Sequence, residues 1–106
     1  MKIIVRTQFT DMHCWENAPE EVSFLRHPHR HIFYVEAEAE VTHDDRELEF
    51  FMVKDKINEF IIDLKQMPVT KSCEQMGLKL KELLKSYYKR EFTIRIFEDN
   101  ENGVEV

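Results

Sequence analysis

The chain has 106 residues, of which 42% are hydrophobic and 34% are charged, and its formal net charge is −6. This length suits one domain with a single hydrophobic core, and we therefore expect one domain over residues 1–106. The acidic balance argues against the binding of nucleic acid through its phosphate backbone. With two glycines in the whole chain, a glycine-rich phosphate-binding loop is excluded.

Composition also bears on the compartment in which the protein resides. The sequence has no apolar run near the about 20 residues of a membrane-spanning helix, and its first residues become polar too soon for a signal peptide. Its two cysteines, Cys14 and Cys73, do not suggest a disulfide framework. We therefore expect a cytoplasmic protein that does not associate with membranes.

The first half of the chain has the two-residue period of β-strands. Residues 2–13 (KIIVRTQFTDMH) alternate, and one face of this predicted strand carries Ile3, Val5, Thr7, Phe9 and His13. Residues 14–28 hold two prolines and no period, which predicts a loop. A second strand is predicted over residues 29–42, and its polar face, typical of a sheet with one side in water, carries Glu36, Glu38 and Glu40. Residues 43–46 (HDDR) are predicted to form the turn after it.

The period changes to three and four residues from Phe51 onward, which predicts helices. The first helix should end before Pro68, and its apolar face is formed by Val53, Ile57, Phe60, Ile61 and Leu64. Ser72 and Gln75 have the spacing of a capping box, so a second helix is predicted to begin there. Its apolar stripe is formed by Cys73, Met76, Leu80, Leu83, Leu84 and Tyr87.

The C-terminal part returns to a period of two residues. Residues 91–98 (EFTIRIFE) predict a strand whose inner face carries Phe92, Ile94, Ile96 and Glu98. Residues 100–103 (NENG) predict a turn, and residues 104–106 predict a short last strand. The predicted order is strand, strand, helix, helix, strand, strand. We expect an α+β fold in which both helices cover one face of a four-stranded antiparallel sheet.

Three histidines interrupt the apolar faces of the first two strands. His13 ends the first strand, and His29 and His31 begin the second with their side chains on the same side. If these strands pair as a hairpin, the three imidazoles can converge, and three imidazoles with an open fourth position are a common zinc site. Two alternatives stay open: His27 can replace one ligand in a shifted register, or the HPHRH segment can be a solvated basic loop. We expect His43, in the far turn, to be exposed.

The carboxylate of Glu98 is a further polar group, at the end of an otherwise apolar strand face. It can simply point into water. If it is held partly buried, it can instead accept two parallel hydrogen bonds from a flat N–H/NH2 edge, such as the edge of a guanine-like or pterin-like ring.

Four segments of the chain resemble, in the right order, motifs of the 6-pyruvoyl-tetrahydropterin synthase and 6-carboxytetrahydropterin synthase (QueD) family. FTDMH (9–13) resembles F-x-A-x-H, and HRHIFYVEAEAEV (29–41) resembles H-G-H followed by an alternating strand. KSCEQMGLKL (71–80) lies where the family has P-T-x-E-N. IFEDNENGVEV (96–106) resembles the closing strand–turn–strand, which carries a pterin-anchoring glutamate. The resemblance implies the tunnelling fold (T-fold), whose subunits assemble into rings and bind substrates between subunits.

Carried over to this sequence, the resemblance implies that His13, His29 and His31 are zinc ligands and that Glu98 anchors a heterocycle. In the family, the zinc ion holds and polarises oxygens of the substrate side chain. The implied partners are a pterin- or purine-like small molecule and further copies of the chain in a homo-oligomeric ring. Exposed sheet edges also favour an oligomer.

The chain departs from the family at positions that carry catalysis. The family's cysteine, four residues before H-G-H, is replaced by Leu25, or by Ser23 in the shifted register, and Cys14 lies outside the motif. The family's Asp-His pair is missing from DLKQMPVT (63–70), and Arg30 replaces the glycine of H-G-H. No catalytic residue is therefore assigned.

Replacements for these groups exist near the predicted site. Glu20 or Glu21 can act as a base and His27 as an acid, although nothing in the sequence requires these roles. Cys73 is interpreted as a core residue because it fits the helical period. Trp15 is interpreted as a packing residue, with stacking on a flat ligand as the alternative.

These observations lead to three hypotheses. The first is a zinc-binding T-fold protein that binds a pterin- or purine-like ligand at a subunit interface, with lyase or synthase chemistry weakened by the missing residues. The second is a non-catalytic module that sequesters a nucleotide or pterin. The third is a structural oligomer in which the histidines bind no metal.

Overall fold

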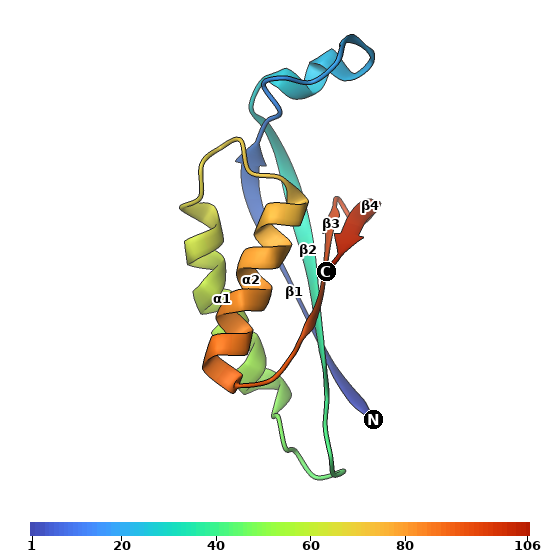
Figure 1. Cartoon of the computed structure of the whole chain (residues 1–106), viewed down its shortest axis with the longest axis vertical. Helices are drawn as coiled ribbons and strands as arrows, with labels where there is room; N and C mark the ends of the chain where they lie inside the picture. Colours follow the sequence, from blue (N-terminus) through green and yellow to red (C-terminus); the bar gives the residue numbers. More distant parts are fainter.

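The computed structural model describes all residues, 1–106, as a four-stranded antiparallel sheet with two helices packed on it (Figure 1). The strands lie side by side in the order β1 (Lys2–His13), β2 (His29–Glu40), β3 (Thr93–Glu98) and β4 (Asn102–Glu105). The helices are α1 (Phe50–Lys65) and α2 (Cys73–Tyr88). The predicted α+β class and the predicted order of elements are confirmed. No helix has the length and apolar character needed to span a lipid bilayer.

Strands β1 and β2 form a long hairpin whose inner face contributes to the core. Their register places Val5 opposite Ala37 and Phe9 opposite Phe33, and all four side chains are buried. Helix α1 packs against β1, and α2 packs against β3 and β4. The core therefore lies between the helices and the inner face of the sheet, where burial of apolar surface is the main driving force for folding.

The outer face of the sheet is polar, as predicted from the glutamates of the second strand. Arg95 of β3 donates hydrogen bonds to the carboxylates of Glu36 and Glu38 on β2, at 2.8 and 2.9 Å. Cross-strand pairs of this kind stabilise neighbouring strands.

The predicted capping box at the start of α2 is confirmed. The Ser72 hydroxyl accepts a hydrogen bond from the Gln75 backbone, and the Gln75 side chain accepts one from the Ser72 backbone. The predicted place of Tyr87 in the apolar stripe is wrong, because Tyr87 is 55% exposed. Its neighbour Tyr88 packs against the core instead, with its ring 5.6 Å from that of Phe92. A period of 3.6 residues does not decide between adjacent tyrosines in the last helical turn.

Four predicted boundaries also need correction, and one is that β3 begins at Thr93, two residues after the predicted start. The predicted loop over residues 14–28 contains a short 3-10 helix, η1 (Glu20–Arg26), which projects beyond the end of the sheet (Figure 1). Strand β2 ends at Glu40, two residues before the predicted end. The Val41 N–H still donates to the carbonyl of Met1, its partner in the register, but the Thr42 N–H donates to the Glu47 side chain instead of to β1.

The last turn is the fourth correction, because it begins before the predicted residues 100–103. Asp99 and Asn100 have φ values of 52° and 59°, and the Glu101 N–H donates to the Glu98 carbonyl at 2.9 Å. Two consecutive positive φ angles define a type I′ hairpin turn, a conformation that Asp and Asn tolerate. The turn therefore follows Glu98 directly, and β4 begins at Asn102.

The fold gathers several chain segments at one end of the sheet. There β1 ends opposite the start of β2, with His13 paired to His29. Strand β3 ends beside β2, with Glu98 paired to Phe33. The loop between the helices reaches the same end, where the Cys14 N–H donates to the Val69 carbonyl at 2.9 Å.

Replacing Gly103 with Ala should lower the free energy of unfolding by about 1–3 kcal/mol, the usual cost of overpacking. A Cβ atom on Gly103 would overlap the Ile96 carbonyl oxygen and the Phe97 ring, and the backbone oxygen cannot rotate away. Urea-induced unfolding would measure the change. Gly77→Ala is the matched control, since its Cβ would meet only the ends of side chains, the nearest being that of Val106 at 3.1 Å. Equal stabilities of the two variants would contradict this account of β4.

Candidate metal centre

Three imidazole rings meet at this end of the sheet. The ring centroids of His13 and His29 are 4.7 Å apart, those of His29 and His31 are 4.9 Å apart, and those of His13 and His31 are 5.2 Å apart. Each ring offers one nitrogen atom, and these nitrogens all lie within 4.8 Å of one another. The structure thus brings the three predicted residues into an arrangement that can hold a metal ion.

Strand geometry explains why the three rings meet. His13 and His29 are direct partners in the β1–β2 register, so their side chains project to the same side of the sheet. His31 lies two residues further along β2, which returns its side chain to that same face. His13 is 8% exposed, and burial lowers its pKa below the usual value for histidine. A neutral imidazole is the form that binds a metal ion.

The Nδ1 atom of each ring is held by an oxygen atom. His13 Nδ1 lies 3.1 Å from the Lys71 carbonyl, His29 Nδ1 lies 2.8 Å from the His27 carbonyl, and His31 Nδ1 lies 2.7 Å from Asp99 Oδ2. A carbonyl or a carboxylate can only accept a hydrogen bond. In the neutral rings Nδ1 therefore carries the proton, and the lone pair is on Nε2.

The Nε2 atoms show that these residues fit a metal ion. Nε2 of His29 and Nε2 of His31 are both buried and have no hydrogen-bond partner. Buried polar atoms without a partner are rare and need an explanation. Histidines that bind metals usually donate their other N–H to an oxygen, which is the arrangement found at all three rings.

The other two histidines lie outside this cluster. His27 contributes its carbonyl oxygen to His29, whereas its own side chain is exposed. His43 is exposed, as predicted, and lies 3.7 Å from Glu47. The HPHRH segment is not a solvated loop throughout, because His29 and His31 are part of β2 and are partly buried.

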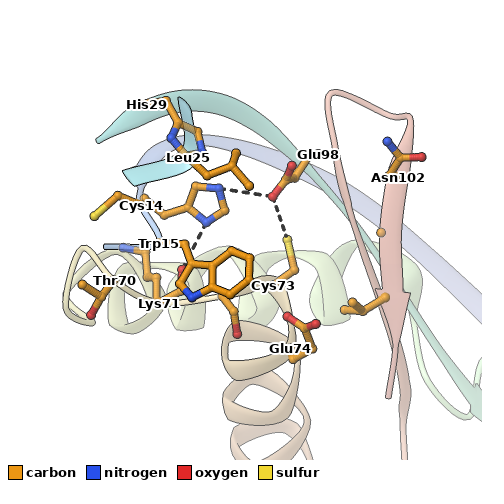
Figure 2. Close-up of a pocket in the computed structure, with 14 residues that line it drawn as sticks. Cys14, Trp15, Leu25, His29, Thr70, Lys71, Cys73, Glu74, Glu98 and Asn102 are labelled. Carbon is orange, nitrogen blue, oxygen red and sulfur yellow. Dashed lines mark hydrogen bonds and ion pairs between the residues drawn. The ribbon is translucent and has the colours of Figure 1, made fainter. Parts of the chain in front are cut away.

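Glu98 points towards the histidines rather than into open water. Its Oε1 atom lies 3.2 Å from His13 Nε2, and its Oε2 atom lies 3.5 Å from His31 Nε2. The Cys73 thiol donates to Oε1 at 3.5 Å (Figure 2). Burial, together with the charge of Glu98, raises the pKa of Cys73 to about 12, so the thiol keeps its proton. Cys73 is a core residue, as predicted, and it also contacts the site.

Lys71 and Asp11 support the site and were not identified from the sequence. Lys71 is 3% exposed, and its Nζ atom lies 2.7 Å from Asp11 Oδ2. This ion pair fastens the loop between the helices to β1, and the same loop presents the carbonyl that holds His13. The sequence does contain one signal for Asp11. The two-residue alternation of the first strand places Asp11 on the same face as His13.

Asp99 is a second residue that sequence reasoning missed. From the type I′ turn it accepts hydrogen bonds from the Ile32 N–H at 3.0 Å and from His31 Nδ1 at 2.7 Å. These bonds lower the pKa of Asp99 below its usual range, with His31 the largest cause. The Asp-Asn pair after Glu98 signals a tight turn, but no local pattern shows that Asp99 reaches His31.

A cavity of about 430 Å³ opens beside the cluster (Figure 2). His13, His29 and Glu98 form part of its wall. Trp15, which is 52% exposed, also lines the cavity. The remaining lining residues come from the chain after β1, from η1, from the loop between the helices, from the start of α2 and from β4: Cys14, Leu25, Thr70, Lys71, Ser72, Cys73, Glu74, Asn102, Gly103 and Val104.

The residues considered as catalytic replacements are not assembled at the cavity. Glu20 is exposed and pairs with Arg26 at 3.3 Å. None of Glu20, Glu21 and His27 lines the cavity, and neither does Ser23, which stands at the position of the family's cysteine in the shifted register. Leu25 does line it, and its side chain can neither donate nor accept a proton.

Comparison of the chain with models of known protein families and with curated protein sequences finds no match. The resemblance to the pterin synthases therefore stays an expectation based on four short segments. The chemistry of the site follows from the positions of its own residues.

Replacing Asp99 with Asn should weaken metal binding by about 10- to 100-fold, which is typical for loss of a group that orients a metal-bound histidine. The two hydrogen bonds use different oxygen atoms of Asp99. Asn has a single oxygen, so either His31 or the Ile32 N–H loses its acceptor. Competition with a chromophoric chelator would give the dissociation constant for Zn²⁺.

Glu101→Gln is the matched control for Asp99→Asn. Glu101 lies in the same turn, is exposed, and undergoes the same change of charge. Equal affinities of the two variants would show that Asp99 does not orient His31 for a metal.

Proposed function

We propose that the chain binds a zinc ion through Nε2 of His13, His29 and His31. The observation that carries this proposal is the state of Nε2 of His29 and His31. Both atoms are buried and make no hydrogen bond, with His31 Nε2 facing Glu98 Oε2 at 3.5 Å, while Nδ1 of each ring donates to an oxygen. A cation where the rings converge supplies the missing partner. Imidazole suits late first-row divalent ions, and three imidazoles form a common zinc site.

The adjoining cavity takes a flat, pterin- or purine-like ligand in this proposal. Its volume, about 430 Å³, lies within the usual range for small-molecule sites. Trp15 offers a half-exposed aromatic face, and Glu98 offers two acceptor oxygens for an N–H/NH2 edge. A zinc ion beside the cavity would act as a Lewis acid on oxygens of the bound molecule.

The tunnelling fold and a ring-shaped homo-oligomer belong to the same proposal. The order of elements agrees with that fold, and β1 and β4 are edge strands whose outer backbone groups have no partner in the sheet. Asn102, Gly103 and Val104 of the edge strand β4 also line the cavity. A second subunit added at this edge would therefore complete the cavity wall and cover the exposed edge.

Binding without turnover is the second candidate function, and the cavity wall favours it. Leu25 occupies the wall at the position where the resembling family has its cysteine. The Cys73 thiol, with its pKa raised to about 12, does not ionise at neutral pH. General acid–base chemistry needs a group that titrates near the working pH, and neither Leu25 nor the Cys73 thiol is such a group. These lining residues therefore favour sequestration of the ligand over lyase or synthase activity.

Elemental analysis of untagged protein tests metal binding directly. We expect about one zinc ion per chain in the wild type, as for a single three-histidine site, and none in the double variant His29→Ala/His31→Ala. The double variant His27→Ala/His43→Ala is the matched control, because it also removes two imidazoles but leaves the cluster intact. Equal metal content in the two double variants would refute the proposed site.

Ligand binding is tested with pairs of purine nucleotides. Guanine presents an N–H/NH2 edge to a carboxylate and adenine does not, so we expect guanine nucleotides and pterins to bind about 10-fold or more tightly than adenine nucleotides, consistent with the discrimination typical of a bidentate pair. Calorimetry would measure the affinities. Recovery of unchanged ligand after long incubation would support sequestration, whereas a product peak would establish turnover. Equal binding of guanine and adenine would contradict the proposed ligand class.

A further inference from the structure

The carboxylate of Glu98 faces ring nitrogens that carry no proton when the imidazoles are neutral. Nδ1 of His13 and Nδ1 of His31 each donate to an oxygen, which leaves a lone pair on Nε2 of each neutral ring. These same Nε2 atoms lie 3.2 and 3.5 Å from the two oxygens of Glu98. Acceptor atoms so close together are stable only when a proton or a cation lies between them.

The spacing of these atoms suits a metal ion. Ligand atoms bound about 2.0–2.1 Å from a zinc ion at tetrahedral angles are about 3.3–3.4 Å apart. The two distances between Glu98 oxygens and histidine nitrogens, 3.2 and 3.5 Å, bracket this value. Glu98 therefore approaches the cluster at the separation expected between two ligands of one ion.

Glu98 also has the kind of support that the histidines have. Each of the three rings is oriented by an oxygen that accepts from Nδ1. Glu98 is oriented by the Cys73 thiol, which donates to its Oε1 atom at 3.5 Å. Ligands of metal ions are commonly fixed by such additional hydrogen bonds.

We infer that Glu98 is the fourth ligand of the metal ion in the ligand-free protein, so that the site is closed by three imidazoles and one carboxylate. This inference rests on the proposed metal binding by His13, His29 and His31. It differs from a role of Glu98 as a heterocycle anchor alone, because the carboxylate then contributes to metal affinity when the cavity is empty. A closed set of four protein ligands leaves no exchangeable position on the ion.

A consequence for the proposed ligand follows from this arrangement. A heterocycle that pairs with both oxygens of Glu98 must withdraw the carboxylate from the metal. The ligand and the metal then compete for Glu98, and the released carboxylate frees a position on the ion for an oxygen of the ligand. The effect of the ligand on metal affinity equals the effect of the metal on ligand affinity.

Metal affinity of Glu98→Gln tests the inference without any heterocycle present. We expect the dissociation constant for Zn²⁺ to rise by at least about 10-fold, because a direct ligand contributes no less than a group that merely orients one. Glu74→Gln is the matched control, since Glu74 lines the same cavity and loses the same charge but is exposed and has no contact with the cluster. Far-UV circular dichroism would establish that both variants are folded.

Cobalt substitution supplies a second readout in the wild-type protein. If Glu98 closes the site, azide leaves the visible absorption bands of bound Co²⁺ unchanged in the wild type and alters them in Glu98→Ala, which opens a position. An azide-sensitive wild-type spectrum would overturn the inference.

The outcomes separate this inference from the proposed function. Metal bound by wild type and by Glu98→Gln with equal affinity, and lost in His29→Ala/His31→Ala, would overturn the role of Glu98 and leave the three-histidine site standing. Absence of metal from the wild type would refute both.

Discussion

The pairing register between β1 and β2 ties the hydrophobic core to the candidate metal centre. The register that stacks Phe9 on Phe33, with ring centroids 5.3 Å apart, also sets His13 opposite His29. A slip of one residue would move every side chain of a strand to the other face of the sheet. Such a slip would expose Val5 and Phe9 and separate the histidines at the same time. Burial of the core thus fixes the geometry of the site.

The groups that orient the histidines come from segments that the core alone does not position. Lys71 is fastened by an ion pair with Asp11 in which the lysine is almost fully buried. Such pairs contribute little net stability because both charges lose their hydration. Removing one partner is costly, however, since the other charge is then left buried alone. The pair therefore holds the loop at one position, and with it the carbonyl that accepts from His13.

Sequence periodicity predicted the strands, the helices and the face on which the histidines lie, because burial imposes a period of two or 3.6 residues on side chains close together in the chain. It did not predict Lys71 or Asp99, whose partners His13 and His31 are 58 and 68 residues away. Lys71 acts through its backbone carbonyl, which no residue type marks. The 3-10 helix Glu20–Arg26 was missed for a related reason, since it buries no residue and leaves no apolar period.

The charges around the three rings favour the proposed binding of a cation. Two carboxylates, Glu98 and Asp99, contact the histidine rings, and the nearby Lys71 is already paired with Asp11. When the three rings are neutral, Glu98 contacts no cation, whereas the positive charge of Arg30 acts on Asp99. A divalent ion bound by the three rings would supply a positive charge beside Glu98. Protonation of the rings could supply the same charge, but it would place like charges on imidazoles 4.7–5.2 Å apart. A single divalent ion would supply the positive charge without that repulsion.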